Sequence, residues 1–243
     1  MNTSPAPLIY QLRRSSRAKN TRIVVTADKI EVVAPIKTPD QRIQAFVNAQ
    51  RDWINAALKR VADKTRSVPS LAPKVYADGA LIPYQGRHLP LIITLSSLKT
   101  VRVELRDDAA FTVRLPAALA TTQHSDLTRQ ALEKWMKNQA RQQVQHWVNH
   151  HAPRFGLFPR QIRIKTLKSR WGSCGPKNDI NLNWLLLLAP PEALEYVVVH
   201  ELCHIRHKNH SQQFWQLVGD HLPNFRQRRL WLKQHGAGVM QGL

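Results

Sequence analysis

The chain has 243 residues, 43% of them hydrophobic and seven of them tryptophan, so it is long enough to bury a large core and too apolar to be disordered. It carries 36 Lys and Arg against 16 Asp and Glu, and only two cysteines. Two cysteines exclude a disulfide framework, and no apolar run approaches the roughly 20 residues that span a bilayer.

The formal charge of +20 favours polyanionic partners. One segment, residues 13–22 (RRSSRAKNTR), holds five basic residues and no acidic one. We therefore expect a nucleoside triphosphate or another polyanion as ligand, and nucleic acid as a further partner. The N-terminus lacks a basic segment followed by an apolar stretch, so we expect no signal peptide, no membrane association and a cytoplasmic location.

In chain order, the N-terminal part is expected to form strands and then a helix. Three β-rich runs are typical of strands: residues 8–14, 22–27 and 29–35. The last two are joined by a turn at Asp28 and Lys29. Residues 38–64 change to helical spacing of apolar side chains, with Thr38 as the cap and Pro39 at the first helical position. This part is expected to cover residues 1–66.

The Pro-rich segment 67–79 is typical of an internal linker. Four further β-rich runs follow it: residues 80–86, 89–95, 100–106 and 111–116. Asp107 and Asp108 are typical of a hairpin turn between the last two runs. We therefore expect residues 67–122 to form an antiparallel β-rich segment.

The remainder, residues 123–243, is expected to form a compact zincin-like metallohydrolase core. A polar helix begins at residue 123, and two short strands and three helices follow it: residues 160–167 and 179–184 as strands, and 191–207, 211–222 and 224–236 as helices. The whole chain is therefore predicted to be an α+β protein, with a β-rich N-terminal part that includes a helix and this core after it.

The expected helix at 191–207 carries an H-E-x-x-H motif. His200 and His204 are four residues apart, so both imidazoles lie on one helix face and can bind one ion. Glu201 sits beside them, where a carboxylate can act as general base on an activated water. His210 is favoured as the third ligand and His207 is the alternative, because catalytic zinc sites use three protein ligands and an open position.

Residues 200–215 (HELCHIRHKNHSQQFW), together with 169–184 and 191–199, resemble the YgjP-like family of metal-dependent hydrolases. Looser matches extend upstream to residues 14–25 and 46–54. The resemblance implies a minimal gluzincin-type core, distantly similar to SprT-like proteins. It also implies His200, His204 and His210 as metal ligands and Glu201 as catalytic base. A metzincin is rejected, because His stands at position 207, where metzincins have glycine.

Two substrate classes compete for this site. The favoured one is a nucleoside triphosphate, cleaved to a monophosphate and pyrophosphate; the resemblance to the YgjP-like family points to UTP. The expected contacts to substrate are Lys165, Lys168, Arg170 and Ser173, which lie close together in the sequence before the H-E-x-x-H motif. The alternative is a zinc metallopeptidase that binds a peptide, or a DNA-associated protein, along an edge strand such as 179–184.

Zinc is the expected ion, since three imidazoles suit it, although Ni2+, Co2+ or Mn2+ fit the same ligands. Four residues near the motif carry secondary expectations. Cys203 is expected to be a buried, unreactive thiol, and Glu195 to be a surface residue. Asn181 and Asn183 alternate on a strand, so they share a face directed towards substrate or solvent.

Overall fold

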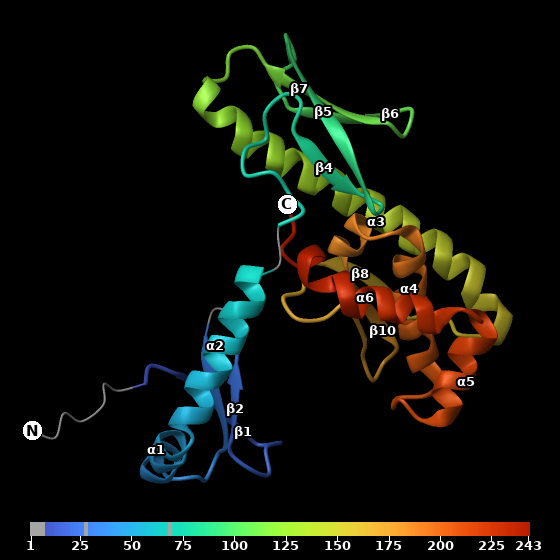
Figure 1. Ribbon diagram of the computed structural model, residues 1–243. Coiled ribbons are helices and arrows are strands. Elements are labelled where there is room, and N and C mark those ends of the chain that lie inside the picture. Colours follow the sequence, from blue (N-terminus) through green and yellow to red (C-terminus); the bar gives the residue numbers. More distant parts are fainter. Residues whose placement is uncertain (1–7, 27–28, 68–69) are drawn as a thin grey trace, which may run out of the picture. The chain divides into compact units, whose positions relative to one another are not determined.

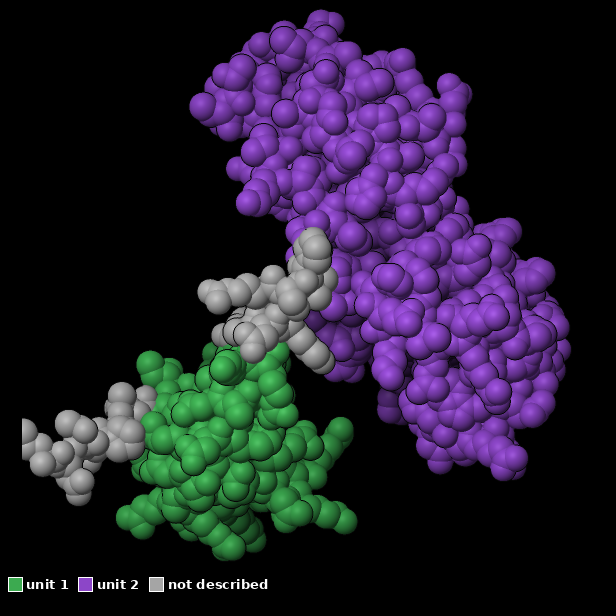
Figure 2. Space-filling model, viewed as in Figure 1, with its two compact units in different colours: residues 1–69 green, residues 70–243 purple. Residues whose placement is uncertain are grey.

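The computed structural model describes residues 8–26, 29–67 and 70–243, and its mixture of helices and sheets confirms the α+β class. The chain divides into two compact units, residues 1–69 and 70–243 (Figure 2). The division expected after residue 66 lies next to this boundary, whereas the one after residue 122 falls inside the second unit. None of the helices in the described ranges is long and apolar enough to cross a membrane.

The first unit contains a three-stranded sheet covered by two helices (Figure 1). Its strands are β1 (Gln11–Ser15), β2 (Arg22–Val25) and β3 (Ile30–Pro35), in the order β1-β3-β2. The central strand β3 pairs in parallel with β1 and antiparallel with β2. Its apolar side chains Ile30, Val32 and Ala34 form the core of this unit. Asp28, part of the expected turn between β2 and β3, lies outside the described residues.

The prediction of a single helix over residues 38–64 is wrong in detail. The segment forms α1 (Asp40–Ala49) and α2 (Arg51–Ser67), with a break at Gln50. Both helices bury apolar residues in the same core, Val47 from α1 and Ile54 from α2. The helix cap is Pro39 rather than Thr38, one residue later than expected.

The second unit begins with a four-stranded sheet in the order β4-β5-β7-β6. Its strands are β4 (Leu81–Tyr84), β5 (Arg87–Ser96), β6 (Arg102–Arg106) and β7 (Ala110–Pro116). The expected hairpin turn is confirmed, with Asp107 and Asp108 at positive φ between antiparallel β6 and β7. The sheet is not purely antiparallel, however, because β7 rather than β6 docks against β5 and pairs with it in parallel.

A short 3-10 helix, η1 (Thr121–Gln123), leads into the longest helix, α3 (His124–Phe155). Buried residues recur every four positions along it, from Leu132 and Met136 to Val144 and Val148, which gives one continuous apolar stripe. The first part of α3 packs on the four-stranded sheet and its last part on the C-terminal elements (Figure 1). One helix therefore joins both parts of the second unit into a single core.

The C-terminal elements surround a three-stranded sheet in the order β8-β10-β9. They are β8 (Gln161–Lys165), β9 (Gly172–Cys174), β10 (Asp179–Asn183), η2 (Trp184–Leu188), α4 (Pro191–Arg206), α5 (Gln212–His221) and α6 (Phe225–Val239). The middle strand β10 pairs in parallel with β8 and antiparallel with β9. Both sides of β10 are therefore paired with other strands. The edge strands of the sheet are β8 and β9, and β9 is the one next to α4.

Candidate metal centre and its cavity

Helix α4 supplies the H-E-x-x-H motif from a buried position. Pro191 opens the helix, and its apolar residues from Ala193 to Cys203 are buried in the core. The helix ends at Arg206, because His207 takes an extended backbone conformation (φ −117°, ψ 105°). The chain then turns back and presents His210 to the end of the motif, before Ser211 caps α5 by accepting a hydrogen bond from the backbone N–H of Phe214 at 3.4 Å.

Three imidazoles meet at this turn. One nitrogen from each of His200, His204 and His210 lies within 4.8 Å of the others. The Nε2 atoms of His200 and His210 are 3.1 Å apart. Two nitrogens bound to one tetrahedral zinc ion at about 2.0–2.1 Å would be about 3.3 Å apart, so this spacing fits a shared divalent metal ion.

The protonation states also fit a metal. Nδ1 of His204 lies 2.9 Å from the backbone carbonyl oxygen of His207, to which it donates its proton, leaving Nε2 as a free lone pair. Burial, reinforced by the neighbouring His204 and His210, lowers the pKa of His200 to about 3, so this ring is neutral at pH 7. His207 itself contributes only its backbone here, and its ring is not in the described cluster.

Glu201 lies beside the three histidines with little room to move. Its carboxyl group is buried, and Oε2 has no hydrogen-bond partner among the described residues. Burial raises the pKa of this carboxyl to about 8, while the positive charge of Arg170 acts in the opposite direction. A divalent cation at the imidazoles would also favour the carboxylate. An unpartnered carboxyl oxygen on a residue that lines the same cavity as His200 can act as a general base for water.

Glu201 and His200 line a cavity of about 360 Å3. Three cations, Arg170, Arg229 and Lys233, line it as well. The other lining residues are Trp171, which precedes β9, and residues of β9, α4 and α6: Gly172, Tyr196, Val197 and Leu232. None of the three cations forms an ion pair with a carboxylate in the described part of the chain. The cavity therefore holds an excess of positive charge even without a metal ion.

The expected substrate contacts are not gathered in this cavity. Arg170 lines it, whereas Lys165, Lys168 and Ser173 do not. Lys165 is exposed on β8, which is separated from β9 by the central strand β10. Ser173 lies next to the cavity residue Gly172, but its hydroxyl accepts a hydrogen bond from the Asn181 amide at 3.3 Å.

Sequence reasoning missed Arg229 and Lys233, which come from α6, about 30 residues after the motif. No local signal marks them, because α6 carries many basic residues and only the packing of the helix selects these two. The upstream basic segment is also partly neutralised, since Arg13 pairs with Glu31 and Arg14 with Asp40.

Three secondary expectations can be compared with the structure. Cys203 is fully buried, as expected, and burial raises the pKa of its thiol to about 12. Glu195 is not a surface residue, because it is buried against α3 and α6. Asn183 faces neither substrate nor solvent: it is buried, and its side chain donates to the Leu167 carbonyl at 2.8 Å.

Known proteins resemble the chain in the region of this site. A family model described as the YgjP-like metallopeptidase domain matches residues 19–235. The chain belongs to the YgjP-like family. The family implies a divalent metal, and the three converging histidines fit one.

Two further similarities accompany this YgjP-like assignment. The UTP pyrophosphatase of Escherichia coli (strain K12) is 35% identical over 71 residues, which are 28% of this chain and 42% of that protein. The match therefore spans less than half of that relative. The metallopeptidase zymogen abylysin of Pyrococcus abyssi is 24% identical and covers 37% of this chain and 93% of its own, with a TM-score of 0.34, too low to support an argument.

Proposed function

We propose that the protein is a metal-dependent hydrolase that cleaves a nucleoside triphosphate, UTP in the first instance, into the monophosphate and pyrophosphate. The observation that carries this proposal is the charge of the cavity. Arg170, Arg229 and Lys233 line it together with Glu201, which is the only carboxylate among the described residues that line it. A triphosphate supplies the negative charge that such a cavity lacks, whereas a peptide backbone is uncharged.

The roles follow from the positions. His200, His204 and His210 would hold the metal, for which zinc suits three imidazoles, and Glu201 would be the general base. A divalent cation in this place supplies Lewis acidity and neutralises charge on the phosphate oxygens. Arg229 and Lys233 would bind phosphate oxygens from α6, and Arg170 from the segment before β9.

The reaction needs one proton transfer at Glu201. A water oxygen attacks the α-phosphorus, the bond from that phosphorus to the oxygen bridging to the β-phosphorus breaks, and pyrophosphate leaves. Glu201 takes the proton from the attacking water, and its buried Oε2, which has no partner in the described structure, is free to accept it. The partial match to a UTP pyrophosphatase supports the choice of UTP.

A metallopeptidase is the second candidate, because of strand β9. The prediction that 179–184 is an edge strand is wrong, because residues 179–183 form the central strand β10; the edge strand that lies against α4 is β9, and its outer backbone edge would pair with an extended peptide. The substrate could then be a protein, including one bound to DNA, to which the basic chain would be attracted. The short strand, three residues long, offers few backbone hydrogen bonds for this purpose.

The two candidates are separated by measuring pyrophosphate release from each of the four ribonucleoside triphosphates with metal-loaded protein. We expect release, fastest with UTP, and a KM raised about tenfold or more in Arg229→Met. Arg226→Met is the matched control, because Arg226 is an exposed residue of the same helix that does not line the cavity. No release from any of the four nucleotides, with cleavage of an unfolded protein substrate instead, would favour the peptidase.

A further inference from the structure

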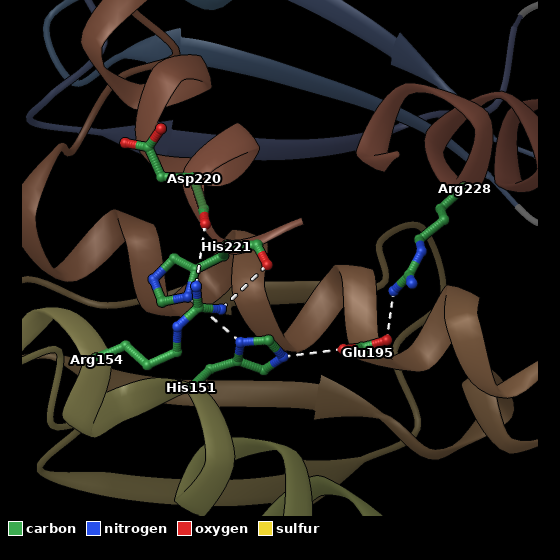
Figure 3. Close-up of polar contacts among 6 residues, drawn as sticks. All are labelled: His151, Arg154, Glu195, Asp220, His221 and Arg228. Atoms are coloured by element: carbon green, nitrogen blue, oxygen red, sulfur yellow. Dashed lines mark hydrogen bonds and ion pairs between the residues drawn. The ribbon is translucent and has the colours of Figure 1, made fainter. Parts of the chain in front are cut away.

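A buried polar network connects helices α3, α4, α5 and α6 (Figure 3). Glu195 of α4 stands at its centre, where Arg228 of α6 and His151 of α3 approach its carboxylate from opposite sides. His151 Nε2 lies 3.0 Å from Oε1 of Glu195, and Arg228 forms an ion pair with Oε2. His221 of α5 continues the chain, its Nδ1 being 3.3 Å from Nδ1 of His151.

The Glu195 carboxylate accepts hydrogen bonds at both of its oxygens, one from Arg228 and one from Nε2–H of His151. The Nδ1 atoms of His151 and His221 lie within hydrogen-bond distance of each other, which extends the network to α5. Burial alone would raise the pKa of the Glu195 carboxyl, but the hydrogen bonds from His151 and Arg228 hold it below its ordinary value. The carboxylate is therefore charged, paired at both oxygens and shielded from water, and it fixes the groups around it.

The network also affects the lining of the cavity, because Arg228 in the network and Arg229 in the cavity are consecutive residues of α6. Successive residues of a helix point about 100° apart, so the rotation of α6 that brings Arg228 to Glu195 also sets the direction of Arg229. One turn later Leu232 and Lys233 lie on the cavity face with Arg229. Arg229 further lies over the Trp215 ring, 4.6 Å from its centre, and that ring stacks on His210.

We infer that Arg228 and Glu195 are positioning residues, which orient α6 so that Arg229 and Lys233 bind the phosphate groups of the substrate. Neither residue lines the cavity, so each acts through α6. This inference rests on the proposed function for its ligand. Losing the pair should weaken the binding of substrate, while the metal ligands and Glu201, on α4 and the following turn, keep their places.

The test is a double-mutant cycle on KM for UTP, with Arg228→Met, Arg229→Met and the double variant, all metal-loaded. If Arg228 acts through Arg229 and Lys233, Arg228→Met raises KM about tenfold, and the double variant raises KM by clearly less than the product of the two single effects, because part of the loss in Arg228→Met is already present in Arg229→Met. The value of kcat should change less than about threefold, and each variant should bind one metal ion per chain. Arg226→Met, which removes a charge from the same helix, should leave KM unchanged.

Inorganic pyrophosphate, titrated calorimetrically into the same variants, gives a second reading of the cycle that does not depend on turnover. The inference would be overturned if the fold-changes in KM and in pyrophosphate affinity caused by Arg228→Met and Arg229→Met simply multiplied in the double variant. It would also be overturned if Arg228→Met lowered kcat and left KM unchanged. Either result would leave the proposed function standing. A wild-type protein that neither hydrolyses UTP nor binds pyrophosphate would overturn both. Should Arg228→Met fail to fold, Arg228→Lys retains the charge without the planar fork, and its coupling to Arg229→Met must have the same sign.

Discussion

Gly172 of β9 lies directly against Glu201 of α4. A Cβ atom built on this glycine would stand 2.6 Å from Oε1 and 2.9 Å from Cδ of the carboxyl group. No side chain larger than hydrogen fits there unless Glu201 moves. The backbone of β9 thus packs against the Glu201 carboxyl group. The close approach of β9 to α4 therefore helps to fix the position of this carboxyl group.

This contact predicts the effect of Gly172→Ala. The added methyl group should displace Glu201, so we expect kcat to fall by about 10- to 100-fold and the free energy of unfolding to fall by about 1–3 kcal/mol. Metal content should be unchanged, since the three atoms nearest to this methyl group all belong to Glu201 and none to a histidine. Gly175→Ala is the matched control, because its nearest neighbour would be the Asp179 carbonyl oxygen at an ordinary 3.6 Å. Equal activity in the two variants would contradict the close contact.

The third ligand can be identified by comparing two histidines. We expect His210→Ala to weaken metal binding by at least about 100-fold, because the loss of a supporting group behind a ligand already costs about 10- to 100-fold. His207→Ala should bind metal almost as well as the wild type, since it keeps the carbonyl that orients His204. Competition with a chromophoric chelator measures both affinities. A larger loss in His207→Ala would reverse the assignment.

The buried His221 predicts a loss of stability in acid. Burial, with the nearby charges of His151 and Arg154, lowers the pKa of His221 from 6.5 to about 4. Between these values the unfolded chain binds the proton more readily than the folded one, so the free energy of unfolding falls as the pH falls. We expect this residue to contribute on the order of 1 kcal/mol to the difference between pH 7 and pH 4.5.

His221→Asn tests this contribution, because asparagine keeps an N–H group near the position of Nδ1 but does not titrate. Urea unfolding at the two pH values should show a smaller loss of stability in the variant than in the wild type. The same substitution at His146, an exposed residue of α3, serves as the control. A pH dependence identical in all three proteins would show that His221 is not held neutral by its burial.

The motif could be predicted from the sequence because its geometry is local. The spacing of His200 and His204 on a helix fixes their common face, and the short turn to His210 leaves little freedom. The burial of α4 follows in the same way from its apolar residues. The H-E-x-x-H spacing itself predicts the metal ligands and the base, and the resemblance to a family implies the same residues in the same roles.

The rest depends on packing that no local pattern encodes. Glu195 lies five residues before His200 and off the ligand face, so the sequence predicts a surface position. The structure buries it instead, because its partners Arg228 and His151 come from helices 33 and 44 residues away. Arg229 and Lys233 are two basic residues among several on α6, and only the rotation of that helix directs them to the cavity. The parallel pairing of β5 with β7 likewise depends on which strand of a hairpin docks.

The measurement that tests the account most directly is the return of UTP hydrolysis when zinc is added to chelator-treated protein. We expect the wild type to regain pyrophosphate release in proportion to zinc, up to one ion per chain. Glu201→Gln should bind the same one ion and stay at least about 100-fold slower. Release that is independent of added metal, or that is undiminished in Glu201→Gln, would contradict a hydrolase built on these three histidines and this carboxylate.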